Sequence, residues 1–196
     1  MTIQSKTSPP ILGRRVQRTH DALRTAMMQL MVECGWDAID IQTLCDRANI
    51  GRSTFYQHFA NKEELLKANF QGLREVLLAQ ARIGTAQAGQ LAFVEGLMAH
   101  VCDAQEVFRA VLDRRSGHYV QDRFRELLVE LVQTELPSGK APTWQTAAQA
   151  RYLGGALFEL LAWWLGHSRG HKPQEMEALF HQWSAPVLVG AGPTVK

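Results

Sequence analysis

The most constraining feature of the sequence is a short stretch, residues 41–59, that leaves room only for two short helices. Asp40 precedes it and can cap the first helix, because its side-chain oxygen can accept from free backbone N–H groups. Asn49 comes in the middle, and asparagine is one of the few residues besides glycine that tolerate a left-handed conformation. A second short helix then fits residues 52–59. The pattern predicts two helices that meet at a tight turn.

Longer helices with their own start and stop signals surround this stretch. Apolar residues at helical spacing predict a first helix from about Arg14 to Cys34, with Gly35 as its stop. Asn61, followed three residues later by Glu64, resembles a capping box that opens a long fourth helix. Strand-like alternation is absent, so the predicted fold class is all-α. Further helices are predicted near residues 90–102, 104–115, 118–136, 144–168 and 173–185.

Positive charge is concentrated at the start of the chain. The formal net charge is only +2, and acidic and basic residues balance from residue 70 onward. We expect residues 1–13 to form a flexible basic arm, which either meets a polyanion or is simply a solvated tail. The first twenty residues contain no acid and four basic residues, Lys6, Arg14, Arg15 and Arg18.

Several classes of protein do not fit this sequence. The three cysteines are far apart and form no Cys-x-x-Cys pair, which argues against a disulfide framework or a structural zinc site and fits a reducing cytoplasm. No signal peptide is evident at the N-terminus. The most apolar run, residues 156–165, is interrupted by Glu159 and is too short to span a bilayer. We therefore expect a cytoplasmic protein with no membrane segment and no cofactor.

Polar residues are expected on the outer side of the second short helix, because the apolar residues of this stretch can form a small core with the first helix. A helix that reads a major groove needs such side chains near its start: Arg and Gln can reach base edges, while Ser, Thr, Tyr and His can hold phosphates. Any surface helix has a polar face, but the combination of cap, turn and following capped helix favours a helix-turn-helix. The outward residues are Arg52, Ser53, Thr54, Tyr56, Gln57 and His58.

Four runs of residues carry a family resemblance: Gly35–Ala38, Ile41–Leu44, Ala48–Phe59 and Asn61–Leu66, with Thr-Phe-Tyr-x-x-Phe followed by Lys-Glu-Glu-Leu. With them, residues 14–66 resemble the DNA-binding domain of TetR-type regulators. The resemblance implies a three-helix helix-turn-helix domain at 14–61 and a larger helical ligand-binding and dimerisation domain at 62–196. It also implies a bacterial transcription regulator rather than an enzyme. By the family's default it is a repressor, which an unidentified small molecule releases from a palindromic operator on double-stranded DNA.

The resemblance also implies contacts with DNA at matching positions. Gln42 and Thr43 begin the supporting helix, and Lys62 begins the fourth helix. Gly51 stands where a Ser or Thr cap is usual, so the second short helix has a weaker start. The full expected DNA-binding set is Arg14, Arg15, Arg18, Gln42, Thr43, Arg52, Ser53, Thr54, Tyr56, Gln57, His58 and Lys62.

The run from residue 156 to residue 165 is apolar nearly all round, which indicates a helix that is covered on every side. In a chain of this size, one side would meet the core and the other a second subunit, although a monomer with an ordinary core helix stays open. Gly154 and Gly155 would allow close helix approach. The expected homodimer interface comprises Leu157, Leu160, Leu161, Trp164, Met176, Leu179, Phe180 and Trp183.

A ligand cavity in the larger domain is a further expectation, with plain core as the alternative for each residue. Its candidate lining is Phe70, Leu73, Phe93, Leu97, His100, Phe108, Arg115, His118, Tyr119 and Trp163.

A metal site is not expected. His167 and His171 are four residues apart, but Gly170 weakens a helix there and no carboxylate spacing supports a site.

Two other function classes were weighed, an enzyme on a helical bundle and an adaptor that binds only protein. Against an enzyme, the sequence contains no Glu-x-x-His pair, no glycine-rich phosphate loop and no serine elbow.

Overall fold

A computed structural model describes residues 13–83, 89–112, 117–136, 144–167 and 170–189, and within these ranges it contains helices and no strand. The all-α prediction is confirmed. The predicted arm lies outside the described residues except for Gly13. The elements are α1 (Arg14–Cys34), the 3₁₀ turn η1 (Trp36–Ala38), α2 (Ile41–Ala48), α3 (Arg52–His58), α4 (Lys62–Ala81), α5 (Phe93–Asp103), α6 (Gln105–Leu112), α7 (Gly117–Glu135), α8 (Trp144–His167) and α9 (Pro173–Val189).

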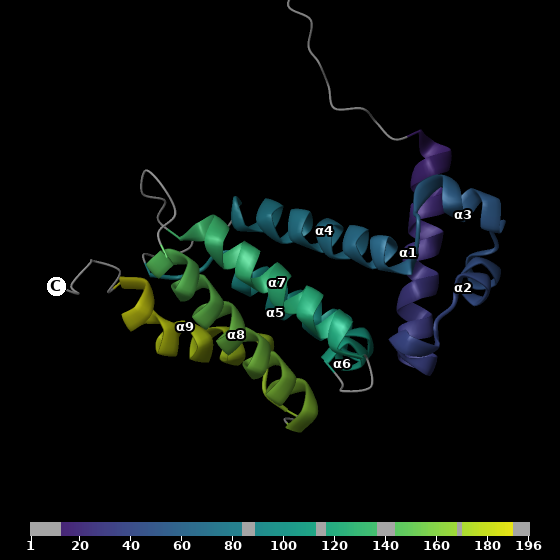
Figure 1. The fold of residues 1–196 in the computed structure, drawn as a ribbon. Helices are drawn as coiled ribbons and strands as arrows, with labels where there is room; N and C mark the ends of the chain where they lie inside the picture. The colour runs from purple at the N-terminus through teal and green to yellow at the C-terminus, as the bar shows by residue number, and fades with distance from the viewer. Residues whose placement is uncertain (1–12, 84–88, 113–116, 137–143, 168–169, 190–196) are drawn as a thin grey trace, which may run out of the picture.

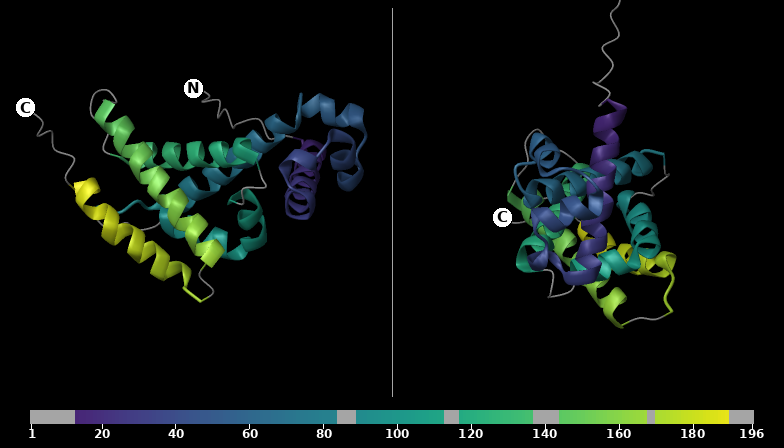
Figure 2. Two further views of the ribbon diagram at one scale, coloured as in Figure 1. Left: turned by 60° about the horizontal axis from the view of Figure 1, so that its bottom comes forward. Right: turned by 90° about the vertical axis from the view of Figure 1, so that its right-hand side faces the viewer.

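The helices form an elongated molecule with two unlike ends. Helices α1, α2 and α3 lie at one end, and α8 and α9 lie side by side at the other (Figure 1). Helix α4 leads from the end that holds α1, α2 and α3 into the larger bundle, as the left view of Figure 2 also shows. Leu65 and Leu66, near the start of α4, are buried, and so is Leu77, near its end. One continuous helix is therefore buried near both of its ends, in a core that runs along the molecule.

The start of α5 depends on a residue far away in the sequence. No local side chain caps it; instead the Glu135 carboxylate of α7 accepts hydrogen bonds from the backbone N–H groups of Ala92 and Phe93. Burial raises the pKa of Glu135, and these two hydrogen bonds oppose the rise. This cap explains why α5 begins at Phe93 rather than near residue 90, where the sequence predicts it.

Helices α7 and α8 pack closely because Gly154 has no side chain. A Cβ atom at Gly154 would lie 2.9 Å from Val129 Cγ2 and 3.0 Å from the Val129 backbone nitrogen. The expected role of Gly154 in close helix approach is confirmed. Gly155, its neighbour, has no atom within 4 Å of such a Cβ and faces open space.

We expect Gly154→Ala to lower the free energy of unfolding by about 1–3 kcal/mol, because the added methyl group meets the backbone of Val129 as well as its side chain. Urea unfolding followed by circular dichroism measures the effect. Gly72→Ala is the matched control, since a Cβ at this helical position meets nothing within 4 Å. It should leave stability unchanged or raise it by about 0.5–1 kcal/mol. Equal stability of Gly154→Ala and the wild type would contradict the close packing.

Candidate nucleic-acid interface

Local residues fix the turn between α2 and α3. The Asp40 carboxylate caps α2 by accepting a hydrogen bond from the Thr43 backbone N–H at 2.7 Å, and this bond lowers the pKa of Asp40. Asn49 adopts the left-handed conformation, with φ 52° and ψ 48°. Gly51 gives α3 no side-chain cap. The predicted caps and turn are therefore confirmed.

Phe55 sets the rotation of α3 about its own axis. Its side chain is fully buried in a core with Leu44 of α2, and the Phe59 ring packs beside it at 5.9 Å. Because successive helical residues point in different directions, burying Phe55 turns the polar residues of α3 away from this core. Four of them are exposed, namely Arg52, Ser53, Tyr56 and Gln57, while Thr54 and His58 are half-buried.

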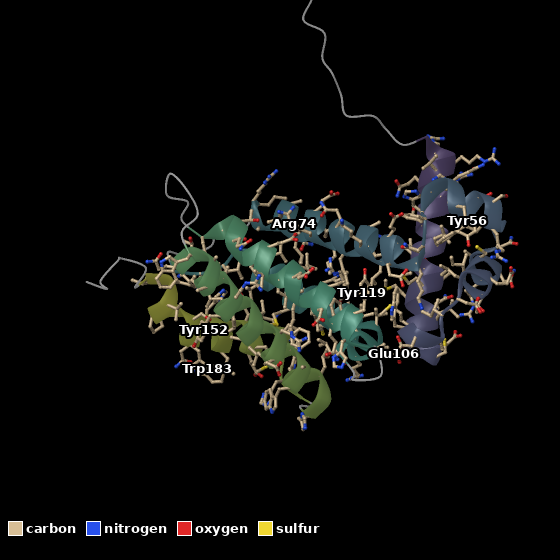
Figure 3. The ribbon with its side chains drawn as sticks, in the orientation of Figure 1. Tyr56, Arg74, Glu106, Tyr119, Tyr152 and Trp183 are labelled. Atoms are coloured by element: carbon tan, nitrogen blue, oxygen red, sulfur yellow. The ribbon has the colours of Figure 1, made fainter. Side chains whose placement is uncertain are left out.

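Arg52 and Tyr56 lie one helical turn apart on the exposed side of α3. The nearby Tyr56 hydroxyl raises the pKa of the Arg52 guanidinium. The Tyr56 ring meets Phe55 edge-on, with 5.5 Å between ring centres. Tyr56 lies at the end of the molecule opposite Tyr152 and Trp183 (Figure 3). The core below thus orients a guanidinium and a hydroxyl that remain accessible.

The N-terminal part of α1 lies beside α3. His20 of α1 packs against the His58 ring at 5.0 Å and the Phe59 ring at 4.9 Å. Further out on the same end of α1, Arg14, Arg15 and Arg18 are all exposed. The predicted basic residues and α3 are therefore brought to one end of the molecule.

Gln42 and Thr43 are both exposed at the start of α2. The Gln42 side chain donates to the Asp46 carboxylate at 2.8 Å, so it is held along its own helix.

Lys62 lies differently from the other expected DNA-binding residues. Its ammonium donates to the carbonyl oxygens of Trp36 and Ile39, at 2.9 and 2.8 Å, and lies 4.6 Å from the centre of the Trp36 ring. The side chain is half-buried. The Lys62 ammonium therefore holds the start of α4 against the segment between α1 and α2.

A stacked pair of aromatic rings, which the sequence did not single out, joins the two ends of the molecule. Trp36 stacks on Tyr119 of α7 with 5.7 Å between ring centres and 16° between ring planes. The Arg123 guanidinium lies 5.7 Å from the Tyr119 ring centre. The Asp37 carboxylate lies against Gly117, where a Cβ would be 3.1 Å from its oxygen. We call Trp36, Asp37, Lys62, Gly117, Tyr119 and Arg123 the Trp36 contact.

The residues predicted to line a ligand cavity separate into groups. Four of them, Phe70, Leu73, His100 and Phe108, line a groove of about 750 Å³ between α1, α4 and the α5–α6 corner. We call it the α1–α4–α6 groove. The part of the lining that α1 contributes was not predicted, because the pattern of this helix indicates only that it supports the helix-turn-helix.

The other candidate lining residues lie elsewhere. Phe93 and Leu97 are fully buried in the core, which was the alternative weighed for them. Tyr119 belongs to the Trp36 contact, His118 is exposed at the start of α7, and Trp163 lies exposed on α8. Arg115 lies outside the described residues.

An exposed apolar surface covers α8 and α9. Tyr152, Trp163 and Trp183 are exposed by 64%, 46% and 64%, which is unusual for such large rings. They border a hollow of about 430 Å³ that also includes Leu160, Leu179 and Phe180. We call this the α8–α9 face.

Several residues predicted for the dimer interface are covered by their own chain. Leu157, Leu161, Trp164 and Met176 are buried within their own chain, and Phe180 is exposed by only 2%. The prediction that they themselves lie on an interface surface is corrected. The reason is that α7 covers the side of α8 that carries Gly154, while α9 packs on α5 as well as on α8.

The described residues contain no group of three or more His, Cys, Asp or Glu residues placed to hold a metal ion. None of the helices in those ranges combines the length and hydropathy that crossing a membrane requires.

Comparison with known proteins gives matches over the DNA-binding region and over most of the chain. The family model described as bacterial regulatory proteins, tetR family, matches residues 23–68. The helix-turn-helix-type transcriptional regulator YxbF of Bacillus subtilis (strain 168) is 28% identical over 179 residues, covering 87% of this chain. The regulator TcmR of Streptomyces glaucescens is 26% identical over 113 residues, 58% of this chain. The chain spans 46% of the length of each of these two relatives.

A solved structure extends the likeness to the helical half. A TetR transcriptional regulator from Streptococcus agalactiae 2603V aligns with a TM-score of 0.63 at 25% identity, covering 87% of this chain and 96% of that one. The fold of the whole helical bundle, and not only its first three helices, is therefore similar to that of this regulator.

His20 provides a pH-dependent test of the packing beside α3. Burial lowers its pKa below the ordinary value of 6.5, the nearby His58 lowers it further, and Asp21 raises it. Its Nε2 atom is buried without a hydrogen-bond partner among the described residues. Between the folded-state pKa and 6.5 the unfolded chain binds more protons, so folding stability should rise with pH across that window and fall as pH drops.

We expect the difference in unfolding free energy between the wild type and His20→Gln to increase with pH across this window. His100 and His181, whose pKa values burial also lowers, are present in both proteins and cancel in the difference. Urea titrations at a series of pH values measure it. A difference independent of pH would show that His20 is solvated in the folded protein.

Proposed function

Because the chain belongs to the TetR family of helix-turn-helix transcriptional regulators, we propose that it binds a palindromic operator on double-stranded DNA as a homodimer. We further propose that it acts in the bacterial cytoplasm as a repressor, which a small molecule releases from the operator. The observation that carries the proposal is the exposed side of α3, where Arg52, Ser53, Tyr56 and Gln57 project from a rigid core.

The chemistry of this surface suits a major groove. Arg52 has a planar guanidinium that can bind a guanine through two hydrogen bonds, and Gln57 can pair with adenine. The Tyr56 hydroxyl and the Ser53 hydroxyl suit phosphate oxygens, which position the protein without reading sequence. Arg14, Arg15 and Arg18 add positive charge at the same end of the molecule. In this scheme Lys62 positions α4 rather than contacting DNA.

The α8–α9 face supports the homodimer. Large exposed rings gathered on two adjacent helices mark a surface that another protein covers. A two-fold arrangement places the same residues of two subunits against each other. It also presents two α3 helices to successive turns of a major groove, which is why the operator should be palindromic.

Selection of bound fragments from genomic DNA tests the regulatory function directly. We expect enrichment of a two-fold symmetric site, with binding that weakens steeply as salt is raised. An adaptor that binds only protein, or an enzyme on this fold, would enrich no site.

Two substitutions on α3 should have different effects on DNA binding. Arg52→Ala should relax the preference at particular base pairs, at a cost of about 1–3 kcal/mol if its contact is bidentate. Tyr56→Phe should weaken binding to all sequences alike, because it removes a phosphate contact. Fluorescence anisotropy on the selected site and on single-base variants separates the two effects. Arg82→Ala, an exposed arginine at the far end of α4, is the control and should change neither. Unchanged affinity in both α3 variants would mean that α3 does not enter the groove.

Trp183→Glu should convert the dimer to a monomer at micromolar concentration, because it places an unpaired carboxylate on the surface that the partner covers. Operator affinity should fall with it, since the two half-sites lose their link. Light scattering gives the mass, and Ile83→Glu, at an exposed apolar residue outside the α8–α9 face, is the control. A wild-type protein that is already monomeric at this concentration would end the dimer proposal.

A further inference from the structure

We propose that the α1–α4–α6 groove binds an uncharged, largely apolar organic molecule that carries a hydroxyl or carbonyl group, and that this molecule is the effector. The proposal rests on the proposed function, because an effector presupposes an operator. It locates the effector between the DNA-binding helices and the larger bundle, with α1 itself forming one wall of the site.

The volume and the apolar lining of the groove suit a small molecule. Its volume of about 750 Å³ lies in the range of pockets that enclose drug-sized ligands. Phe70 and Phe108 contribute rings to its lining. At its edges Val32 of α1 and Val76 of α4 are exposed by 42% and 49%, although both are apolar. A bound apolar body would cover both side chains.

Amide side chains line both walls of the groove. On α4, Asn69 is half-buried and its Nδ2 atom meets the Met27 sulfur at 3.4 Å, which is a weak acceptor. On α1, Gln29 also lines the groove. An amide both donates and accepts, so a ligand hydroxyl or carbonyl would give Asn69 a stronger partner than the thioether does. Such groups orient a ligand without requiring it to carry charge.

Two charged residues at the rim, Glu33 and Arg24, are already paired within the protein. Glu33 and Arg47 form a bidentate ion pair, with both N–O distances at 2.6 Å. Arg24 lies 3.8 Å from the Asp21 carboxylate. A charged ligand would have to compete with these partners, so the lining favours an uncharged one.

The remaining titratable groups around the groove agree with this assignment. Burial lowers the pKa of His100, Asp103 raises it and Arg24 lowers it, so at neutral pH the ring is uncharged. His100 packs edge-on against Phe108, with 5.7 Å between ring centres. Glu106 is exposed to solvent at the outer edge, on α6 (Figure 3).

The position of the groove gives the ligand a route to the DNA-binding surface. A ligand shifts an equilibrium only if it has different affinities for the two states. One that touches α1 on one side and α4 and α6 on the other has this property, because its contacts change whenever α1 moves relative to the bundle. Through His20 and Phe59, a movement of α1 carries α3 with it. A change in operator affinity of about 5- to 150-fold is the usual size of such coupling.

Nile red is a suitable probe, because it is uncharged, planar and largely apolar and carries one carbonyl group. Gly72→Trp and Val76→Trp should each fill the groove from α4, since the first position faces open space and the second is exposed. Gly72→Ala is the matched control, and circular dichroism checks that every variant folds. We expect the wild type and Gly72→Ala to bind the dye, and both Trp variants to lose about ten-fold or more in affinity.

Undiminished dye binding in both Trp variants would overturn the site, because the dye would then lie elsewhere, such as on the α8–α9 face. Absence of binding to the wild type would overturn the chemical class. The effector role is measured separately, by operator affinity with and without Nile red. Lowered affinity in the wild type but not in Gly72→Trp supports that role, and no change in the wild type overturns it. A failure of the proposed function would instead appear as the absence of any enriched DNA site.

Discussion

The Lys62 ammonium lies at a junction between the two ends of the molecule. It binds the carbonyl oxygens of Trp36 and Ile39 and lies over the Trp36 ring, while that ring stacks on Tyr119 of α7. One cation therefore joins the start of α4, the end of the first helical segment and the larger bundle. Because a half-buried charge needs its partners, the start of α4 cannot move away from η1 without losing them.

Helix α4 transmits this constraint along the molecule. Asn61 caps it, with its side chain accepting from the Glu64 N–H at 2.9 Å, and the Glu64 carboxylate bonds back to the Ala60 N–H. Its 20 residues span about 30 Å. Leucines near both of its ends are buried in one continuous core, so a tilt of this helix would disturb packing at both ends.

The sequence was sufficient for much of the DNA-binding surface because its signals are local. The Asp40 and Asn61 caps, the left-handed Asn49 and the inward Phe55 follow from residues within one or two turns of each other, and the structure contains all four. The family signature lies in the same stretch. By contrast, nothing local in the sequence indicates that Lys62, which is predicted as a DNA contact, donates to the carbonyl oxygens of Trp36 and Ile39.

The sequence by itself therefore determined the set of helices, the local caps of α2 and α4, and the side of α3 that faces outward. These features depend on neighbours along the chain. Only the tertiary structure decided which side of the apolar helix α8 is covered, which put Leu157 in the core and Trp163 on the surface. It also decided that α1 forms a wall of a groove and that Glu135 caps α5. Such outcomes depend on how helices distant in sequence pack, and periodicity within one helix cannot specify its partner.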